Sequence, residues 1–224
     1  WQAALDSLEE AGRGYIKNPI PILRPVEARK ARIYLKQGLP DKASSWAQAR
    51  GLSVMDAVEY QDEYEYLTLA RVRLAYPSLA GVDELLERLL AAAETQKRLE
   101  SVLEILLVQA MAHQAQDDLP RSLAALERAL ALAEPEGYLR LFVDEGEAMR
   151  RLLLKFKSEI HLQAAHPRRG YVDKILAAFS PAGVIARPPN AGQSTDLIEP
   201  LTDREIEILR LIAAGHSNAE ISRR

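Results

Sequence analysis

Helical periodicity runs almost without interruption from about residue 25 to residue 179, and this pattern limits the possible folds of the chain more than any other feature. Alanine, leucine, glutamate and arginine dominate the stretch, and the alternation typical of strands is scarce. Glycines and prolines lie mainly between the periodic segments, where helices are expected to end. We predict helices over residues 25–37, 41–50, 58–75, 82–95, 99–115, 120–133, 138–143, 145–163 and 168–179. The predicted fold class is therefore all-α.

These helices form pairs that repeat after about forty residues. Equivalent places are taken by Ala31, Tyr34, Gly38, Ala43 and Ala47, then by Ala70, Arg73, Val82 and Leu86, then by Ala110, His113, Asp117, Ser122, Leu126 and Ala129. Small residues let the two helices of a pair approach closely, and larger apolar residues fill the space between pairs. The pattern resembles a degenerate tetratricopeptide repeat, with Arg73 and Asp117 where a large apolar residue and a glycine are usual. The resemblance implies a right-handed superhelix whose neighbouring pairs share one core.

Residues 201–224, LTDREIEILRLIAAGHSNAEISRR, have the pattern of two short helices. Thr202 forms a capping box with Glu205. Gly215 follows the last periodic residue of the first helix, where a left-handed C-cap is expected. A second capping box begins at Ser217. This spacing fits a helix-turn-helix, and it also fits a generic helical hairpin.

The order of residues in this segment resembles the start of the LuxR-type DNA-binding domain. The matching positions are Leu201, Thr202, Arg204, Glu205, Leu209, Leu211, Ala213, Gly215, Ser217, Asn218, Glu220 and Ile221. The resemblance covers the first helix and the beginning of the second, so we expect the recognition helix to lie beyond the end of this chain. Thr202, Arg204, Ser217 and Asn218 would then position the truncated helix-turn-helix on phosphates without reading bases.

A second resemblance lies in residues 134–156, EPEGYLRLFVDEGEAMRRLLLKF. This run is similar to the end of the helical-repeat region in large LuxR-family regulators of the maltose-activator type. Such regulators carry an ATPase module, a winged-helix region, a helical-repeat sensor and a LuxR-type module, in that order. We therefore predict a tetratricopeptide-like sensor domain over residues 1–179 and a LuxR-type module beginning at residue 201. Residues 180–200, rich in proline and glycine, would form a flexible linker between them. The alternative is an ordinary solvent-exposed loop with no regulatory role.

Composition excludes several function classes. A net charge of −3 argues against a broad nucleic-acid-binding surface on the main body. The chain has no cysteine, no phosphate-binding glycine loop and no histidines with the carboxylate spacing of a metal site. We therefore expect no enzyme activity, no cofactor and no metal. No segment is long and apolar enough to span a bilayer, so we expect a cytoplasmic protein with no membrane partner.

The concave face of a repeat superhelix is its usual binding surface. The repeat alignment places Arg32, Arg71 and Met111 there, with Leu35, Leu74 and Gln114 one turn further along the same helices. Arg32 and Arg71 at equivalent places could hold an anionic ligand or an acidic peptide through forked hydrogen bonds. The alternative is that both arginines are simply solvated.

An acidic, tyrosine-rich segment opens one of the predicted helices. It consists of Tyr60, Asp62, Glu63, Tyr64, Glu65 and Tyr66. Acidic residues in a first helical turn complement the helix dipole. Tyrosines beside them could also form the rim of a ligand or partner site, because their rings combine apolar contact with a hydrogen-bonding hydroxyl.

The favoured hypothesis is an effector-sensing fragment of a LuxR-family transcription regulator. Its repeat domain would bind a small-molecule inducer or a regulatory protein, and DNA would be a partner only of the full-length parent. Self-association is compatible with this reading. The alternative is a tetratricopeptide-like interaction scaffold that does not bind DNA, and an enzyme with a site in the groove is a third hypothesis.

Overall fold

The computed structural model describes residues 1–13, 22–161 and 167–179, which fall within the compact unit Trp1–Ser180. The elements are α1 (Gln2–Arg13), α2 (Val26–Lys36), α3 (Pro40–Ala49), the short 3-10 helix η1 (Tyr60–Asp62), α4 (Glu63–Arg73), α5 (Val82–Thr95), α6 (Leu99–Ala115), α7 (Leu119–Ala133), α8 (Arg140–Val143), α9 (Glu147–His161) and α10 (Arg169–Ala178). Within the described residues there is no strand. The predicted all-α fold class is confirmed.

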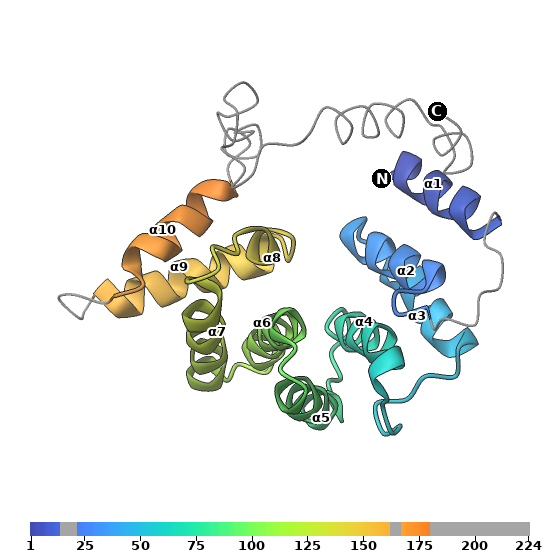
Figure 1. Cartoon of the computed structure of the whole chain (residues 1–224), viewed down its shortest axis with the longest axis horizontal. Helices are drawn as coiled ribbons and strands as arrows, with labels where there is room; N and C mark the ends of the chain where they lie inside the picture. The colour runs from blue at the N-terminus through green and yellow to red at the C-terminus, as the bar shows by residue number, and fades with distance from the viewer. Residues whose placement is uncertain (14–21, 162–166, 180–224) are drawn as a thin grey trace, which may run out of the picture. The chain divides into compact units, whose positions relative to one another are not determined.

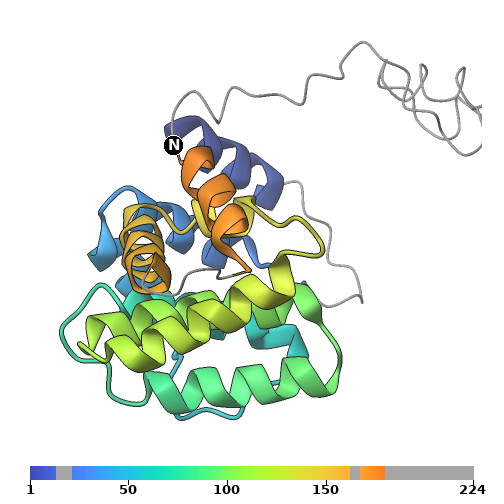
Figure 2. The same cartoon turned by 90° about the vertical axis from the view of Figure 1, so that its left-hand side faces the viewer.

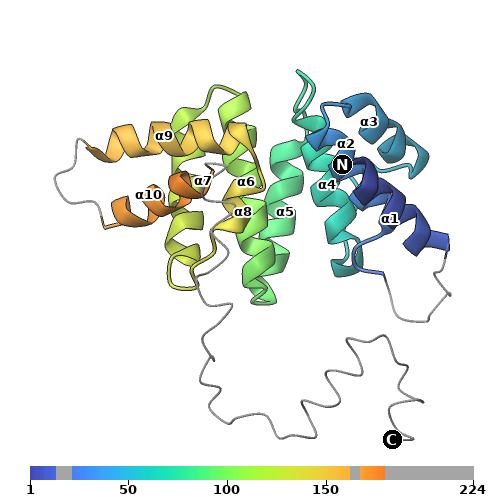
Figure 3. The ribbon, with the colours of Figure 1, turned by 90° about the horizontal axis from the view of Figure 1, so that it is seen from above.

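The helices pack as antiparallel neighbours in chain order. Helix α2 packs on α3, α4 on α5 and α6 on α7, and each pair contacts the next through α3 and α4 or through α5 and α6 (Figures 1 and 2). Helices α2, α4 and α6 line the inner side of this row (Figure 1). Helix α1 packs on α2, and α9 packs on α10 (Figure 3).

The predicted crossing residues form the contacts within the pairs. Ala31, Ala70 and Ala110 are fully buried at corresponding places on the first helices. Leu86 and Leu126 on the second helices are also fully buried and belong to the same core. Because an alanine brings two backbones close while a leucine fills the remaining space, this alternation explains why pairs form and then stack. The repeat predicted from spacing is therefore present in the packing.

The connections between helices explain one departure from the repeat pattern. Gly38 lies in the turn that follows α2 and has a φ of +72°. Asp117 takes the same left-handed conformation in the turn that follows α6, with a φ of +59°. The following amide donates back to the helix in both turns, from Leu39 to Tyr34 O and from Asp118 to His113 O. Asp117 thus makes the turn that glycine makes elsewhere, since aspartate tolerates this conformation better than most residues.

Helix boundaries differ from the predictions at a few places. Helix α1 was not predicted, because Leu5 is its one buried residue and its apolar stripe is short. The predicted helix over 58–75 begins as the 3-10 turn η1 and ends at Arg73, which is exposed. The segment predicted over 138–143 is helical only in α8, a single turn held in place by the fully buried Phe142.

Candidate effector-binding cavity

A cavity of about 930 Å³ opens on the inner side of the helical row. Its walls come from α1, α2, α4, α6 and the segment from α8 to the start of α9. The charged lining residues are the basic Arg24, Arg29, Arg32, Lys36 and Arg71 and the acidic Glu100, Glu104, Asp144 and Glu145. Leu35, Leu74 and Met111 contribute apolar surface. This volume and this mixture of apolar walls with converging polar groups are typical of small-molecule sites.

A second hollow of about 820 Å³ lies between α1, α2 and the start of α4. Gly12, Arg13 and Ile22 line it, next to residues 14–21, which lie outside the described part of the chain. Asp62 and Glu65 of the acidic, tyrosine-rich segment line this hollow, whereas Arg32, Arg71 and Met111 do not. The cavity on the inner side is therefore the candidate site.

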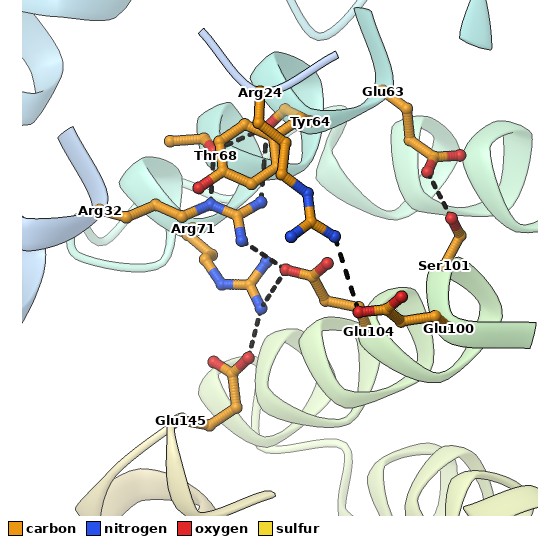
Figure 4. Close-up of polar contacts among 10 residues, drawn as sticks. All are labelled: Arg24, Arg32, Glu63, Tyr64, Thr68, Arg71, Glu100, Ser101, Glu104 and Glu145. Atoms are coloured by element: carbon orange, nitrogen blue, oxygen red, sulfur yellow. Dashed lines mark hydrogen bonds and ion pairs between the residues drawn. The ribbon is translucent and has the colours of Figure 1, made fainter. Parts of the chain in front are cut away.

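Arg32 of α2 is held on three sides (Figure 4). Its Nε donates to Thr68 Oγ1 at 2.7 Å, its Nη1 donates to Glu104 Oε1 at 2.5 Å, and its guanidinium carbon lies 3.7 Å from the centre of the Tyr64 ring. Stacking on an aromatic face and hydrogen bonding at the edge are what the flat guanidinium does best. Burial lowers the pKa of Arg32, the neighbouring charge of Arg71 lowers it further, and Glu104 offsets only part of the shift.

Arg71 of α4 joins two carboxylates from other helices (Figure 4). Its Nη2 lies 3.2 Å from Glu104 Oε1 and also forms an ion pair with Glu145 Oε1. Burial acts to lower the pKa of Arg71, but Glu145 and Glu104 outweigh it and hold this pKa above its usual value. The other terminal nitrogen, Nη1, is buried and has no hydrogen-bond partner among the described residues.

Glu104 of α6 is the centre of the network because it accepts a hydrogen bond from Arg32 and forms an ion pair with Arg71. Burial acts to raise its pKa, yet the charges of Arg71 and Arg32 lower it below its usual value. One side chain on α6 therefore links α2 with α4, and Glu145 extends the chain of charges to the turn between α8 and α9. We name Arg32, Arg71, Glu104 and Glu145 the cavity network.

The structure brings three of the four predicted ligand residues together. Arg32, Arg71 and Met111 line the cavity, and Gln114 is half-buried and lies outside its lining. The two arginines are not solvated, since their side chains are 18% and 12% exposed and both form ion pairs within the chain. Sequence reasoning missed Glu104, although it precedes Met111 by about two helical turns, as Tyr64 precedes Arg71, and so lies on the same helical face.

The acidic, tyrosine-rich segment divides among several contacts. Tyr64 lines the cavity, and Tyr66 donates to Asp56 at 2.8 Å. Glu65 is buried and accepts two hydrogen bonds from Arg50, each of 2.9 Å. Since Glu63 and Glu65 also lie in the first turn of α4, most of this segment holds the fold together. Only Tyr64 takes part in the candidate site.

The remaining predicted residues, Thr202, Arg204, Ser217 and Asn218, lie outside the described part of the chain. Among the residues that the structure describes, no cluster of histidine and acidic side chains could hold a metal ion. None of the helices in this part of the chain is long and apolar enough to cross a membrane.

Comparison with known families agrees with this arrangement of helices. Residues 1–159 match the family described as the MalT-like TPR region. The chain belongs to this family. Residues 199–224 match the bacterial regulatory proteins of the luxR family, so the MalT-like repeat region is followed by a LuxR-type segment. Both resemblances predicted from sequence are confirmed, and the chain is that of a LuxR-family regulator. No curated protein and no solved structure matches it.

Proposed function

We propose that the MalT-like repeat region binds an effector in the inner cavity and thereby controls the LuxR-type module. The effector is an inducer or the exposed segment of a regulatory protein, and DNA is the partner of the LuxR-type module. Residues 180–200 connect the two parts in this proposal. The match of residues 199–224 to regulators argues against a scaffold that does not bind DNA.

The observation that supports this proposal is the origin of the cavity walls. They come from α2, α4, α6 and the turn before α9, which belong to successive parts of the repeat row. A ligand that touches all of them binds well only when these helices have one relative arrangement. Such a ligand shifts the population toward that arrangement, which is the physical requirement for a sensor.

A thermal-shift screen of metabolites against this chain tests the proposal. A ligand specific for the folded state stabilises it by about 2.7 kcal/mol at a hundredfold excess over Kd. We expect a stabilising compound whose effect is lost in Met111→Ala, because Met111 forms part of the cavity wall. Gln114→Ala is the matched control, since Gln114 lies on the same helix outside the lining. A compound that stabilises wild type and Met111→Ala equally would place its site elsewhere and refute the proposal.

The regulatory step is tested in the full-length regulator. We expect the same compound to change the affinity for promoter DNA, and Met111→Ala to abolish that change while leaving the affinity without compound unaltered. Binding to the cavity with no effect on DNA affinity would contradict control of the module.

A further inference from the structure

We propose that the effector carries an anionic group, a carboxylate or a phosphate, and that this group replaces Glu145 at Arg71. Glu145 is then a tethered competitor that occupies the anion site of the resting sensor. This inference rests on the proposed function of the cavity, and it identifies the chemical class of the ligand and the contact that the ligand breaks.

Arg71 has the unused capacity that an anion requires. A guanidinium group binds a carboxylate or phosphate best with two parallel N–H donors. The carboxylates of Glu104 and Glu145 both pair with Nη2 of Arg71. The other terminal nitrogen, Nη1, is buried and has no hydrogen-bond partner within the described residues. An unpaired buried donor is unfavourable. An external anion that accepts from Nη1 and Nη2 together would satisfy both nitrogens, which Glu145 does not achieve.

Glu145 is the partner that can leave. Glu104 lies within the long helix α6 and is also bound to Arg32, so its movement would break two contacts on a packed helix. Glu145 lies in the turn between α8, a four-residue helix, and α9, beside Gly146 with φ +77°. A turn of this kind can change its backbone angles while the packed helices on each side keep their positions.

The charge of the cavity also favours an anion. Its lining has five basic and four acidic side chains, and release of Glu145 into water would leave five basic and three acidic ones. A monoanion or dianion would restore the balance in a place where charges are poorly screened. A neutral ligand could displace Glu145 only by leaving Arg71 with fewer partners.

The exchange has a structural consequence. The pair between Arg71 and Glu145 joins α4 to the turn before α9, and their positions are 74 residues apart in the sequence. Replacement of Glu145 by a free anion ends this tie while the anion remains on Arg71. Effector binding is thereby converted into release of the α8–α9 turn.

The test measures anion binding to the chain with succinate and with inorganic phosphate, at constant ionic strength, by thermal shift and calorimetry. The neutral analogue of succinate, succinamide, is the ligand control. The proteins are wild type, Glu145→Gln and Arg71→Gln. Glu147→Gln is the matched control, since Glu147 lies just beyond the same turn and pairs with Arg150 rather than with the cavity network.

We expect Glu145→Gln to bind succinate or phosphate at least about tenfold more tightly than wild type, because a tethered carboxylate competes at high effective concentration. Glu147→Gln should bind as wild type does, and Arg71→Gln should not bind. Tighter succinate binding alone would identify a carboxylate site, and tighter phosphate binding alone a phosphate site. Equal affinity in wild type and Glu145→Gln, or equal binding of succinamide, would overturn the inference.

The outcome is separable from that of the proposed function. A neutral effector whose binding depends on Met111 but not on Arg71 would overturn the anionic class and leave the effector cavity standing. Anion binding that depends on Arg71, together with effectors that ignore Met111, would retain the anion site and refute the sensor proposal.

Discussion

Replacement of Glu104 by glutamine tests the cavity network as a source of stability. The Glu104 side chain is 19% exposed, accepts a hydrogen bond from Arg32 at 2.5 Å and forms an ion pair with Arg71 at 3.2 Å. Hydrogen bonds to charged groups contribute about 1.5–3 kcal/mol each. Glutamine keeps the shape and one neutral acceptor but removes the charge that compensates two buried cations. We therefore expect the free energy of unfolding to fall by about 2–3 kcal/mol at pH 7.

The matched control lies one helical turn earlier on the same face of α6. Glu100 pairs with Arg24 at 3.6 Å, and its side chain is 62% exposed. An ion pair in water contributes little, so Glu100→Gln should change the free energy of unfolding by less than about 0.5 kcal/mol. Urea unfolding followed by far-ultraviolet circular dichroism measures both variants, with equal slopes if the denatured states match. Trp46 fluorescence in a Trp1→Phe background gives an independent probe, since Trp46 is buried and Trp1 is exposed.

The pH dependence separates the charge of Glu104 from its packing. The pKa of Glu104 is lowered in the folded protein below its ordinary value of 4.5, so its charge stabilises the fold above that pH. This contribution is lost as the pH falls through the lowered native pKa. The difference between wild type and Glu104→Gln should accordingly be full at neutral pH and shrink in acid. A difference that stays constant with pH, or a Glu104 effect no larger than that of Glu100, would refute the electrostatic argument.

Three further substitutions test the packing and the turns, each by urea unfolding. Lys97 has a φ of +54° at the end of a helix. Lys97→Gly should therefore stabilise the fold by about 0.5–1 kcal/mol, which is more than Asp117→Gly, because aspartate tolerates this conformation better. A loss of stability in Lys97→Gly would contradict that reasoning. The buried Trp46 indole N–H has no hydrogen-bond partner among the described residues. Trp46→Phe should therefore lower the free energy of unfolding by much less than the about 3–5 kcal/mol expected of Trp46→Ala. Similar losses in the two variants would show that the indole N–H matters. Ala110→Leu should destabilise by at least about 1–3 kcal/mol, since Ala110 is fully buried at a crossing, and a neutral result would place the crossing elsewhere.

The fold was predictable from the sequence where small residues recur at the places where two helices cross. Ala31, Ala70 and Ala110 recur at one spacing, and their burial required only that paired helices approach closely. Helix α1 was missed because its stability depends on contact with α2 rather than on a long apolar stripe of its own. Helix identity was thus recoverable from periodicity, and contacts between distant segments were not.

The same limit applies to the cavity. Spacing predicted that Arg32, Arg71 and Met111 lie on one surface, and all three line the cavity. It did not reveal that Glu104 and Glu145 occupy the two guanidinium groups, because these partners lie 72 and 74 residues away in the sequence. Composition alone cannot distinguish a free arginine from one that is already paired. Spacing alone therefore leaves two solvated arginines as an alternative.

The positions joined by the cavity network suggest why a repeat protein would keep it. In a stack of helical pairs each unit contacts its neighbours, and stability is close to a sum of local terms. The pair Arg32–Glu104 joins α2 to α6 past the intervening pair α4–α5, and Arg71–Glu145 joins α4 to the turn before α9. These two ion pairs couple helical pairs of the stack that packing alone leaves independent. A ligand that breaks one of them can shift the α8–α9 turn while every neighbouring contact persists, so we expect hydrogen exchange to rise in that turn and not in α6.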